Sequence, residues 1–83
     1  MDLKQRFNRC DYERKMDRIR DGMKWYRTKW LHLTQKEAGE LAGLAQRTVS
    51  HYETGDIMFS PELFLAYSNL GFDIHTALRG DYK

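Results

Sequence analysis

Closely spaced helix start and stop signals along residues 34–80 constrain the fold of this chain more than any other feature. Thr34 and Glu37 have the spacing of a capping box, in which the threonine hydroxyl accepts a backbone N–H and the glutamate reaches back. Serine followed by proline at positions 60 and 61 is a second helix start, and Asp73 is a third. Glycine, a common helix terminator, stands at positions 43, 55, 71 and 80. These signals predict four short helices, over about residues 35–42, 46–53, 61–69 and 74–79.

A longer helix is predicted ahead of them, over about residues 12–29, from a single apolar stripe. The stripe residues are spaced alternately four and three apart: Tyr12, Met16, Ile19, Met23, Tyr26 and Trp30. Trp25 falls off this stripe, and the pattern leaves open whether it is exposed, covers a neighbour or belongs to an interface. Residues 1–11 either extend the helix or form an N-terminal arm, and residues 12–83 form the domain.

Strand signals are weak throughout the chain. No stretch alternates cleanly between apolar and polar residues, and β-branched residues are few. The balance of 41% hydrophobic and 31% charged residues is typical of a globular domain, and 83 residues are enough for one. The predicted fold is therefore all-α: a compact five-helix bundle with an extended N-terminal first helix or arm.

The charge is unevenly distributed along the chain. Residues 1–30 carry ten Lys and Arg against five Asp and Glu, whereas residues 31–83 carry four against seven. A basic segment joined to a mildly acidic one raises the question of nucleic-acid binding. The basic residues form either a solvated surface or a flank that contacts DNA.

Several classes of protein are disfavoured by the composition. A single cysteine, Cys10, permits no intrachain disulfide and fits a reducing cytoplasm. The longest apolar run, residues 63–67, is far shorter than the about 20 residues that span a bilayer, and no signal peptide is recognisable. No zinc-ligand spacing is formed by His32, His51 and His75. We therefore expect no membrane association, metal, cofactor or enzymatic activity, and no small-molecule ligand in so short a chain.

The most informative stretch, residues 33–55, has the pattern of two short helices joined at Gly43. The first helix is kept thin by Ala38, Gly39 and Ala42. The second turns Val49 and Tyr52 inward and directs a row of polar side chains outward: Gln46, Arg47, Ser50 and His51. Two helices that cross steeply at a glycine-containing turn form a helix-turn-helix unit, whose second helix fits the major groove of DNA.

This stretch resembles the lambda-repressor/Cro-like helix-turn-helix regulators, also called the XRE family. The matching positions are Leu33-Thr34-Gln35, Glu37-Ala38, Gly43, Thr48-Val49-Ser50, Glu53 and Gly55. The resemblance extends more loosely over roughly residues 18–80. It implies a lambda-repressor-like bundle with the motif at about residues 35–53, and a bacterial or phage protein that binds double-stranded DNA to regulate transcription.

The resemblance also implies roles for individual positions. The side chains that would read bases are Gln46, Arg47, Ser50 and His51. The side chains that would contact phosphates are Gln35, Lys36 and Thr48. Arginine suits the O6 and N7 acceptors of guanine, and glutamine suits the N6 and N7 groups of adenine.

Two residues of the motif depart from the family pattern. Ala45 stands where a serine or threonine usually caps the second motif helix, and a missing cap costs about 1 kcal/mol unless another group supplies it. Gly39 replaces the usual alanine, which predicts very close packing, against Trp30 or Tyr52.

A third departure concerns Glu53, which in this family often pairs with an arginine of the first helix. Seven residues before Gln35, where that arginine would stand, lies Thr28. The partner is therefore shifted or missing, and the substitutes are Arg27 and Arg20.

The C-terminal apolar residues are candidates for a twofold interface, which the family often builds in this part of the chain. They are Phe72, Ile74, Leu78 and Tyr82. The alternative is that they close the core of the monomer. Because one short recognition helix reads few base pairs, we expect a homodimer with two such helices about 34 Å apart on a palindromic site.

The leading hypothesis is a cytoplasmic transcriptional repressor that blocks a promoter by occupying its operator. A second is the antitoxin of a toxin–antitoxin pair, which would bind its own promoter and grip a protein partner, a toxin or another regulator, through residues 1–20 or the C-terminus. A third is a helical protein-interaction module without DNA binding, against which the polar row on the second motif helix argues.

Overall fold

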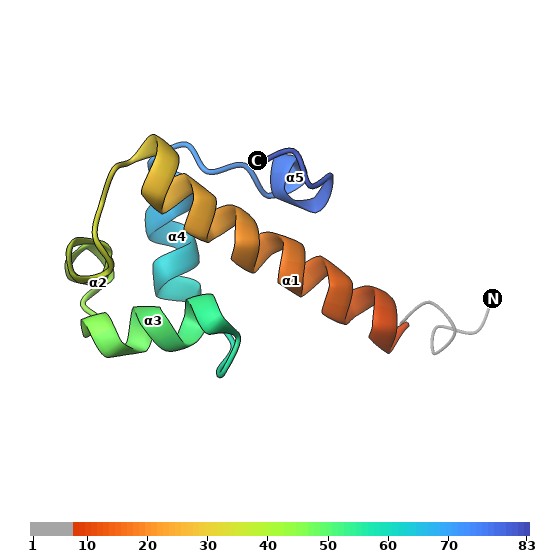
Figure 1. Cartoon of the computed structure of the whole chain (residues 1–83), viewed down its shortest axis with the longest axis horizontal. Coiled ribbons are helices and arrows are strands. Elements are labelled where there is room, and N and C mark those ends of the chain that lie inside the picture. Colours follow the sequence, from red (N-terminus) through yellow and green to blue (C-terminus); the bar gives the residue numbers. More distant parts are fainter. Residues whose placement is uncertain (1–7) are drawn as a thin grey trace.

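The computed structural model describes residues 8–83. All regular secondary structure in this range is helical (Figure 1). The segments are α1 (Arg9–Trp25), the π-helical turn η2 (Tyr26–Trp30), α2 (Gln35–Ala42), α3 (Gln46–Thr54), α4 (Pro61–Asn69) and α5 (Ile74–Leu78). The predicted all-α bundle is confirmed, and the four short helices begin at the predicted residues. The first helix begins earlier than predicted and ends in a turn that the sequence did not indicate.

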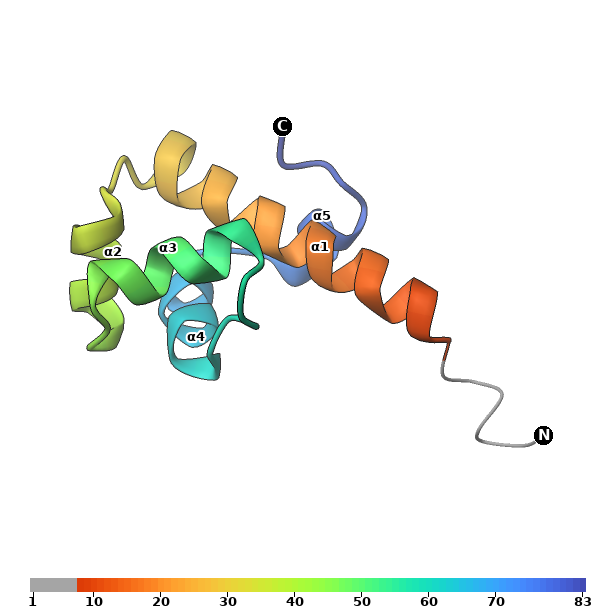
Figure 2. The same ribbon diagram turned by 60° about the horizontal axis from the view of Figure 1, so that its bottom comes forward.

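α1 begins at a local cap and extends beyond the rest of the bundle. The side chain of Asn8 accepts a hydrogen bond from the backbone N–H of Asp11, at 3.0 Å. The C-terminal half of α1 packs against α3 and α5, while its N-terminal half projects away from the other helices in both views (Figures 1 and 2). Residues 9–11 therefore belong to the first helix, and residues 1–7 of the expected arm lie outside the described residues.

The core is built from apolar side chains that every helical segment contributes. Its buried members are Ile19, Met23, Tyr26, Ala38, Val49, Tyr52, Leu63, Tyr67, Phe72 and Ala77. Half-buried residues, among them Met16 and Leu31, pack against them. None of the helices in the described range is long and apolar enough to cross a membrane.

The predicted apolar stripe is correct at its centre and wrong at its ends. Trp30 is 63% exposed, and Tyr12, in the projecting half of α1, is 40% exposed. In η2 the N–H of Leu31 bonds to the carbonyl of Tyr26, five residues back, at 2.9 Å. A π-helical turn contains one residue more than an α-helical turn, so the next residue on the core-facing side is Leu31 instead of Trp30. Leu31 accordingly packs against the core.

Trp25 covers a neighbour, which was one of the three alternatives that the sequence left open. Its ring stacks on that of Tyr82 with centroids 5.4 Å apart. Tyr82 also contacts Tyr26 and Phe72, so aromatic rings join the end of the chain to α1 and η2. These contacts fix the helix that carries the buried arginine described below.

Candidate DNA-binding surface

α2 and α3 cross closely because Gly39 has no side chain. A Cβ atom on Gly39 would lie 2.4 Å from the carbonyl oxygen of Leu44 and 3.4 Å from a Val49 methyl group. The turn between the helices is closed by Gly43 at φ 70°, in the left-handed region, and by the Leu44 N–H bonding to the Gly39 carbonyl at 2.7 Å. The expected close packing is confirmed, but its partners are Leu44 and Val49 rather than Trp30 or Tyr52.

α3 buries one face and presents the other to solvent. Val49 is fully buried and Tyr52 is 8% exposed, and both face the core. Ala45 stands at the N-cap position before the helix, and its side chain makes no capping hydrogen bond, as the sequence predicted. The four residues with a predicted base-reading role lie together on this helix: Gln46 and Arg47 are exposed, and Ser50 and His51 are half-buried. Thr48 is half-buried as well.

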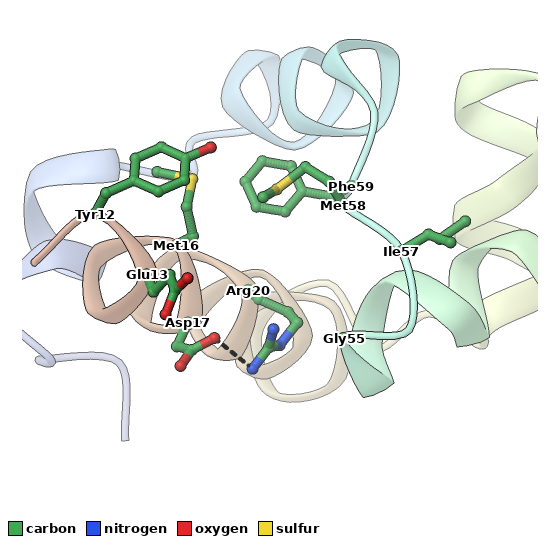
Figure 3. Close-up of a pocket in the computed structure, with 9 residues that line it drawn as sticks. All are labelled: Tyr12, Glu13, Met16, Asp17, Arg20, Gly55, Ile57, Met58 and Phe59. Atoms are coloured by element: carbon green, nitrogen blue, oxygen red, sulfur yellow. Dashed lines mark ion pairs between the residues drawn. The ribbon is translucent and has the colours of Figure 1, made fainter. Parts of the chain in front are cut away.

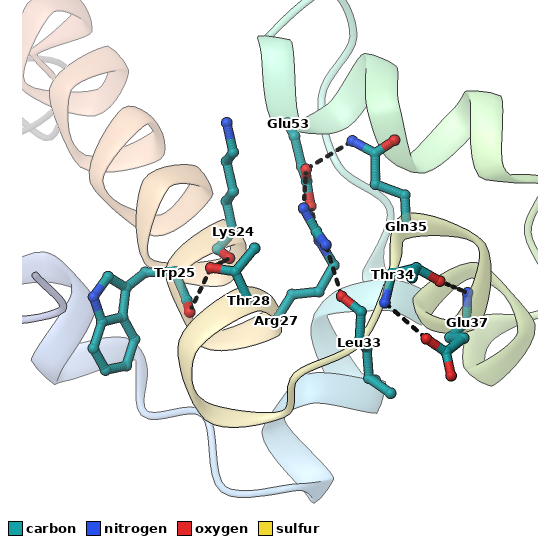
Figure 4. A network of polar contacts seen from close by, with 9 residues as sticks. All are labelled: Lys24, Trp25, Arg27, Thr28, Leu33, Thr34, Gln35, Glu37 and Glu53. Carbon is teal, nitrogen blue, oxygen red and sulfur yellow. Dashed lines mark hydrogen bonds and ion pairs between the residues drawn. The ribbon is translucent and has the colours of Figure 1, made fainter.

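A buried ion pair holds α3 against η2, the turn that follows α1 (Figure 4). The guanidinium group of Arg27 donates from Nε and Nη2 to the two carboxylate oxygens of Glu53, the second at 2.9 Å. Its Nη1 donates to the Leu33 carbonyl at 2.7 Å, and the Gln35 amide donates to the same carboxylate at 3.0 Å. This cluster, the Arg27–Glu53 clamp, therefore connects η2, α2, α3 and the segment between η2 and α2.

The arginine partner of Glu53 is Arg27, one of the two substitutes that the sequence offered. Arg27 lies eight residues before Gln35, and the residue seven before it, Thr28, bonds to the Lys24 and Trp25 carbonyls instead. The π-helical turn contains one residue more than an α-helical turn, so it absorbs the extra residue between Arg27 and Gln35. η2 thus brings Arg27 opposite Glu53 despite the extra residue, and no sequence signal indicated this turn.

The N-terminus of α2 carries the residues with a predicted phosphate-contacting role. Thr34 and Glu37 form both hydrogen bonds of the capping box, and the N–H group of Thr34 lowers the pKa of the Glu37 carboxyl. Gln35 is half-buried, and its amide group donates one hydrogen bond to Glu53. Lys36 is exposed beside it.

His51 is the one predicted base-reading residue whose side chain is paired in the described structure. Its Nδ1 lies 3.0 Å from a carboxylate oxygen of Asp56, in the segment after α3. The hydrogen bond with His51, and after it one with Thr54, lowers the pKa of Asp56. The pairing with Asp56 involves Nδ1 of His51 and not Nε2.

The candidates for a C-terminal interface lie mostly within the monomer. Phe72 is 4% exposed and belongs to the core, which leaves it almost no surface for a second molecule. The other three are half-buried: Ile74, Leu78 and Tyr82. Within residues 8–83, no group of three or more His, Cys, Asp or Glu side chains could hold a metal ion.

Comparison with known proteins gives one match. A family model described as helix-turn-helix matches residues 23–70, which is more than half of the chain and runs from the end of α1 to the end of α4. No curated protein and no solved structure matches.

Proposed function

The chain belongs to the XRE type of the helix-turn-helix family of DNA-binding regulators, and from this premise we propose that it is a repressor that binds a palindromic operator as a homodimer. It acts in the cytoplasm and blocks a promoter by occupying the operator. The observation that carries this proposal is the polar row on the outer face of α3, held in place by the Arg27–Glu53 clamp.

The residues divide between reading bases and fixing the register. α3 enters the major groove, where Arg47 pairs with a guanine and Gln46 with an adenine. Ser50 and His51 make the remaining base contacts. The N-terminus of α2, with Gln35 and Lys36, rests on the phosphate backbone together with Thr48 of α3, because free N–H groups at a helix start attract anions.

A dimer supplies the specificity that one reading helix lacks. α3 has nine residues, so it is about 14 Å long and covers only part of one turn of the duplex. Two copies with their α3 helices about 34 Å apart would read successive major grooves on one side of the DNA. The preferred site is therefore a pair of inverted half-sites.

Selection of preferred duplexes from a random pool, followed by titration of variants, tests the proposal. Arg47→Ala should weaken binding to the selected site by about 1–3 kcal/mol and relax the preference at one base position. Lys36→Ala is the matched control, since loss of a phosphate contact weakens selected and random duplexes alike. Failure of the wild-type chain to bind any duplex at low salt, or equal behaviour of the two variants, would overturn the assignment.

The antitoxin hypothesis remains the second candidate, because the projecting half of α1 offers an amphipathic surface next to the DNA-binding unit. An antitoxin would bind DNA in the same way. Purification of the untagged chain with its genomic neighbours distinguishes the two, since only the antitoxin should retain a partner in a fixed ratio.

A further inference from the structure

Apolar side chains gather where α1 faces the segment between α3 and α4. A cleft of about 290 Å³ is lined by Met16, Ile19, Phe59, Pro61, Phe64 and Ile74. A second cleft adjoins the first, with which it shares Met16 and Phe59, and extends to Met58 (Figure 3). We call this combined surface the α1–α4 groove.

The groove is too exposed to be explained as part of the core. Met58, in the segment that follows α3, is 54% exposed, and its side chain points toward α1 (Figure 3). Exposed apolar side chains that line a cleft make it a candidate site of association. The helix that forms one wall also projects beyond the bundle, and a few helical turns are marginal in water without a packing partner.

The charges on the rim of the groove indicate what occupies it. Glu13 and Arg20 stand seven residues apart on the same flank of the α1 stripe and carry opposite charges. When two copies of such a helix pack antiparallel, the same flanks face each other. Glu13 of each copy then meets Arg20 of the other, while Arg20 keeps its 2.8 Å ion pair with Asp17.

We propose that the α1–α4 groove receives the projecting half of α1 from a second copy of this chain, in a twofold dimer. A twofold contact requires that each copy present the same self-complementary surface, and here each copy offers both a groove and a helix. A nucleic acid would instead require a rim of one sign. This inference rests on the proposed function, because it identifies the interface of the homodimer proposed there.

The position of the groove also suits the reading of DNA. Met58 comes four residues after the end of α3 at Thr54, so the interface lies near the C-terminal end of the recognition helix. Stable interfaces bury about 800 Å² on each partner, roughly one-seventh of the 5942 Å² surface of this chain. Of the four C-terminal residues that the sequence offered for an interface, only Ile74 lines the groove.

The oligomeric state of the full chain without DNA tests the proposal. Sedimentation equilibrium of the wild type across the micromolar range should show a monomer–dimer equilibrium. Met58→Glu and, separately, Met16→Glu should raise the dimer dissociation constant at least tenfold, because each places a charge in the apolar contact. Leu41→Glu is the matched control: Leu41 is 50% exposed on α2, away from the groove, and its variant should dimerise like the wild type.

Several results would overturn the proposal. They are a wild type that stays monomeric at every concentration, groove variants that dimerise normally, and a control that dissociates as much as they do. Thermal unfolding followed by circular dichroism confirms that each variant is folded. A duplex with one half-site separates this proposal from the DNA-binding one: a monomer that still binds it refutes only the interface, and a dimer that binds no duplex refutes only the function.

Discussion

Arg27 and Glu53 form an ion pair in which both side chains are buried, 9% and 7% exposed, whereas the other ion pairs within residues 8–83 lie at the surface. The carboxylate accepts two bonds from Arg27 and one from Gln35. Because Glu53 is on α3 and Arg27 is on η2, this one pair sets how the recognition helix sits on the rest of the domain.

Removal of the arginine should therefore cost far more than removal of a surface cation. Arg27→Ala leaves a buried carboxylate without its counter-charge, and we expect it to lower the free energy of unfolding by about 3–5 kcal/mol. Arg9→Ala is the control, since the Arg9–Glu13 pair is 83% and 62% exposed and its loss should change little. Urea unfolding of both variants measures the difference, and similar losses would mean that the clamp does not hold the fold.

Helix boundaries were predictable from sequence because local groups set them. Thr34, Ser60 and Asp73 cap the helices that follow them, and each does so through its own side chain on a backbone N–H within three residues. The outer face of α3 was predictable because helical periodicity alone places Val49 and Tyr52 on the opposite face from the polar row.

Apart from the start of α1, where the local cap formed by Asn8 was missed, the errors arose where distant contacts decide the outcome. The π-helical turn forms where Tyr26 donates to the Leu70 carbonyl and Arg27 reaches Glu53, and both partners lie far away in sequence. Trp30 was therefore expected in the core and is exposed. Leu31 takes its place, which periodicity over a regular helix could not show.

A cap added to α3 should stabilise the domain. Ala45 already has the extended backbone of a cap residue, φ −72° and ψ 151°, but no side chain that bonds to the helix. Ala45→Ser supplies an acceptor for the free N–H groups and should raise the free energy of unfolding by about 1 kcal/mol. Thr34→Ala is the converse variant, which removes a working cap and should lower it by about as much. If Ala45→Ser did not raise the free energy of unfolding, another group would already have to bond to the N–H groups at the start of α3.

Gly39 should not tolerate even a methyl group. Alanine is favoured over glycine in a helix by about 1 kcal/mol, but the new Cβ would lie 2.4 Å from the Leu44 carbonyl oxygen, which is backbone and cannot rotate away. We expect the clash to win and Gly39→Ala to lower the free energy of unfolding by about 1–3 kcal/mol. Gly22→Ala is a milder comparison, since the Cβ would meet the Ala77 side chain at 2.9 Å. A more stable Gly39→Ala variant would show that α2 and α3 can separate without cost.

Tyr67 should make the domain sensitive to alkaline pH. Burial, and after it the charge of Glu53, raises the pKa of Tyr67 to about 12, from 10.0 for an exposed tyrosine. The unfolded chain therefore loses this proton at lower pH than the folded one, so the stabilisation is complete below pH 10 and is lost as the pH rises to about 12. By this linkage the titration of Tyr67 alone should lower the free energy of unfolding by about 1 kcal/mol between pH 9 and 11.

The Tyr67 hydroxyl bonds to no protein atom within residues 8–83, so Tyr67→Phe should keep its stability at pH 8 and lose less than the wild type at pH 11. Urea unfolding of the wild type and Tyr67→Phe at the two pH values measures this, and equal losses in the two chains would place the alkaline transition elsewhere.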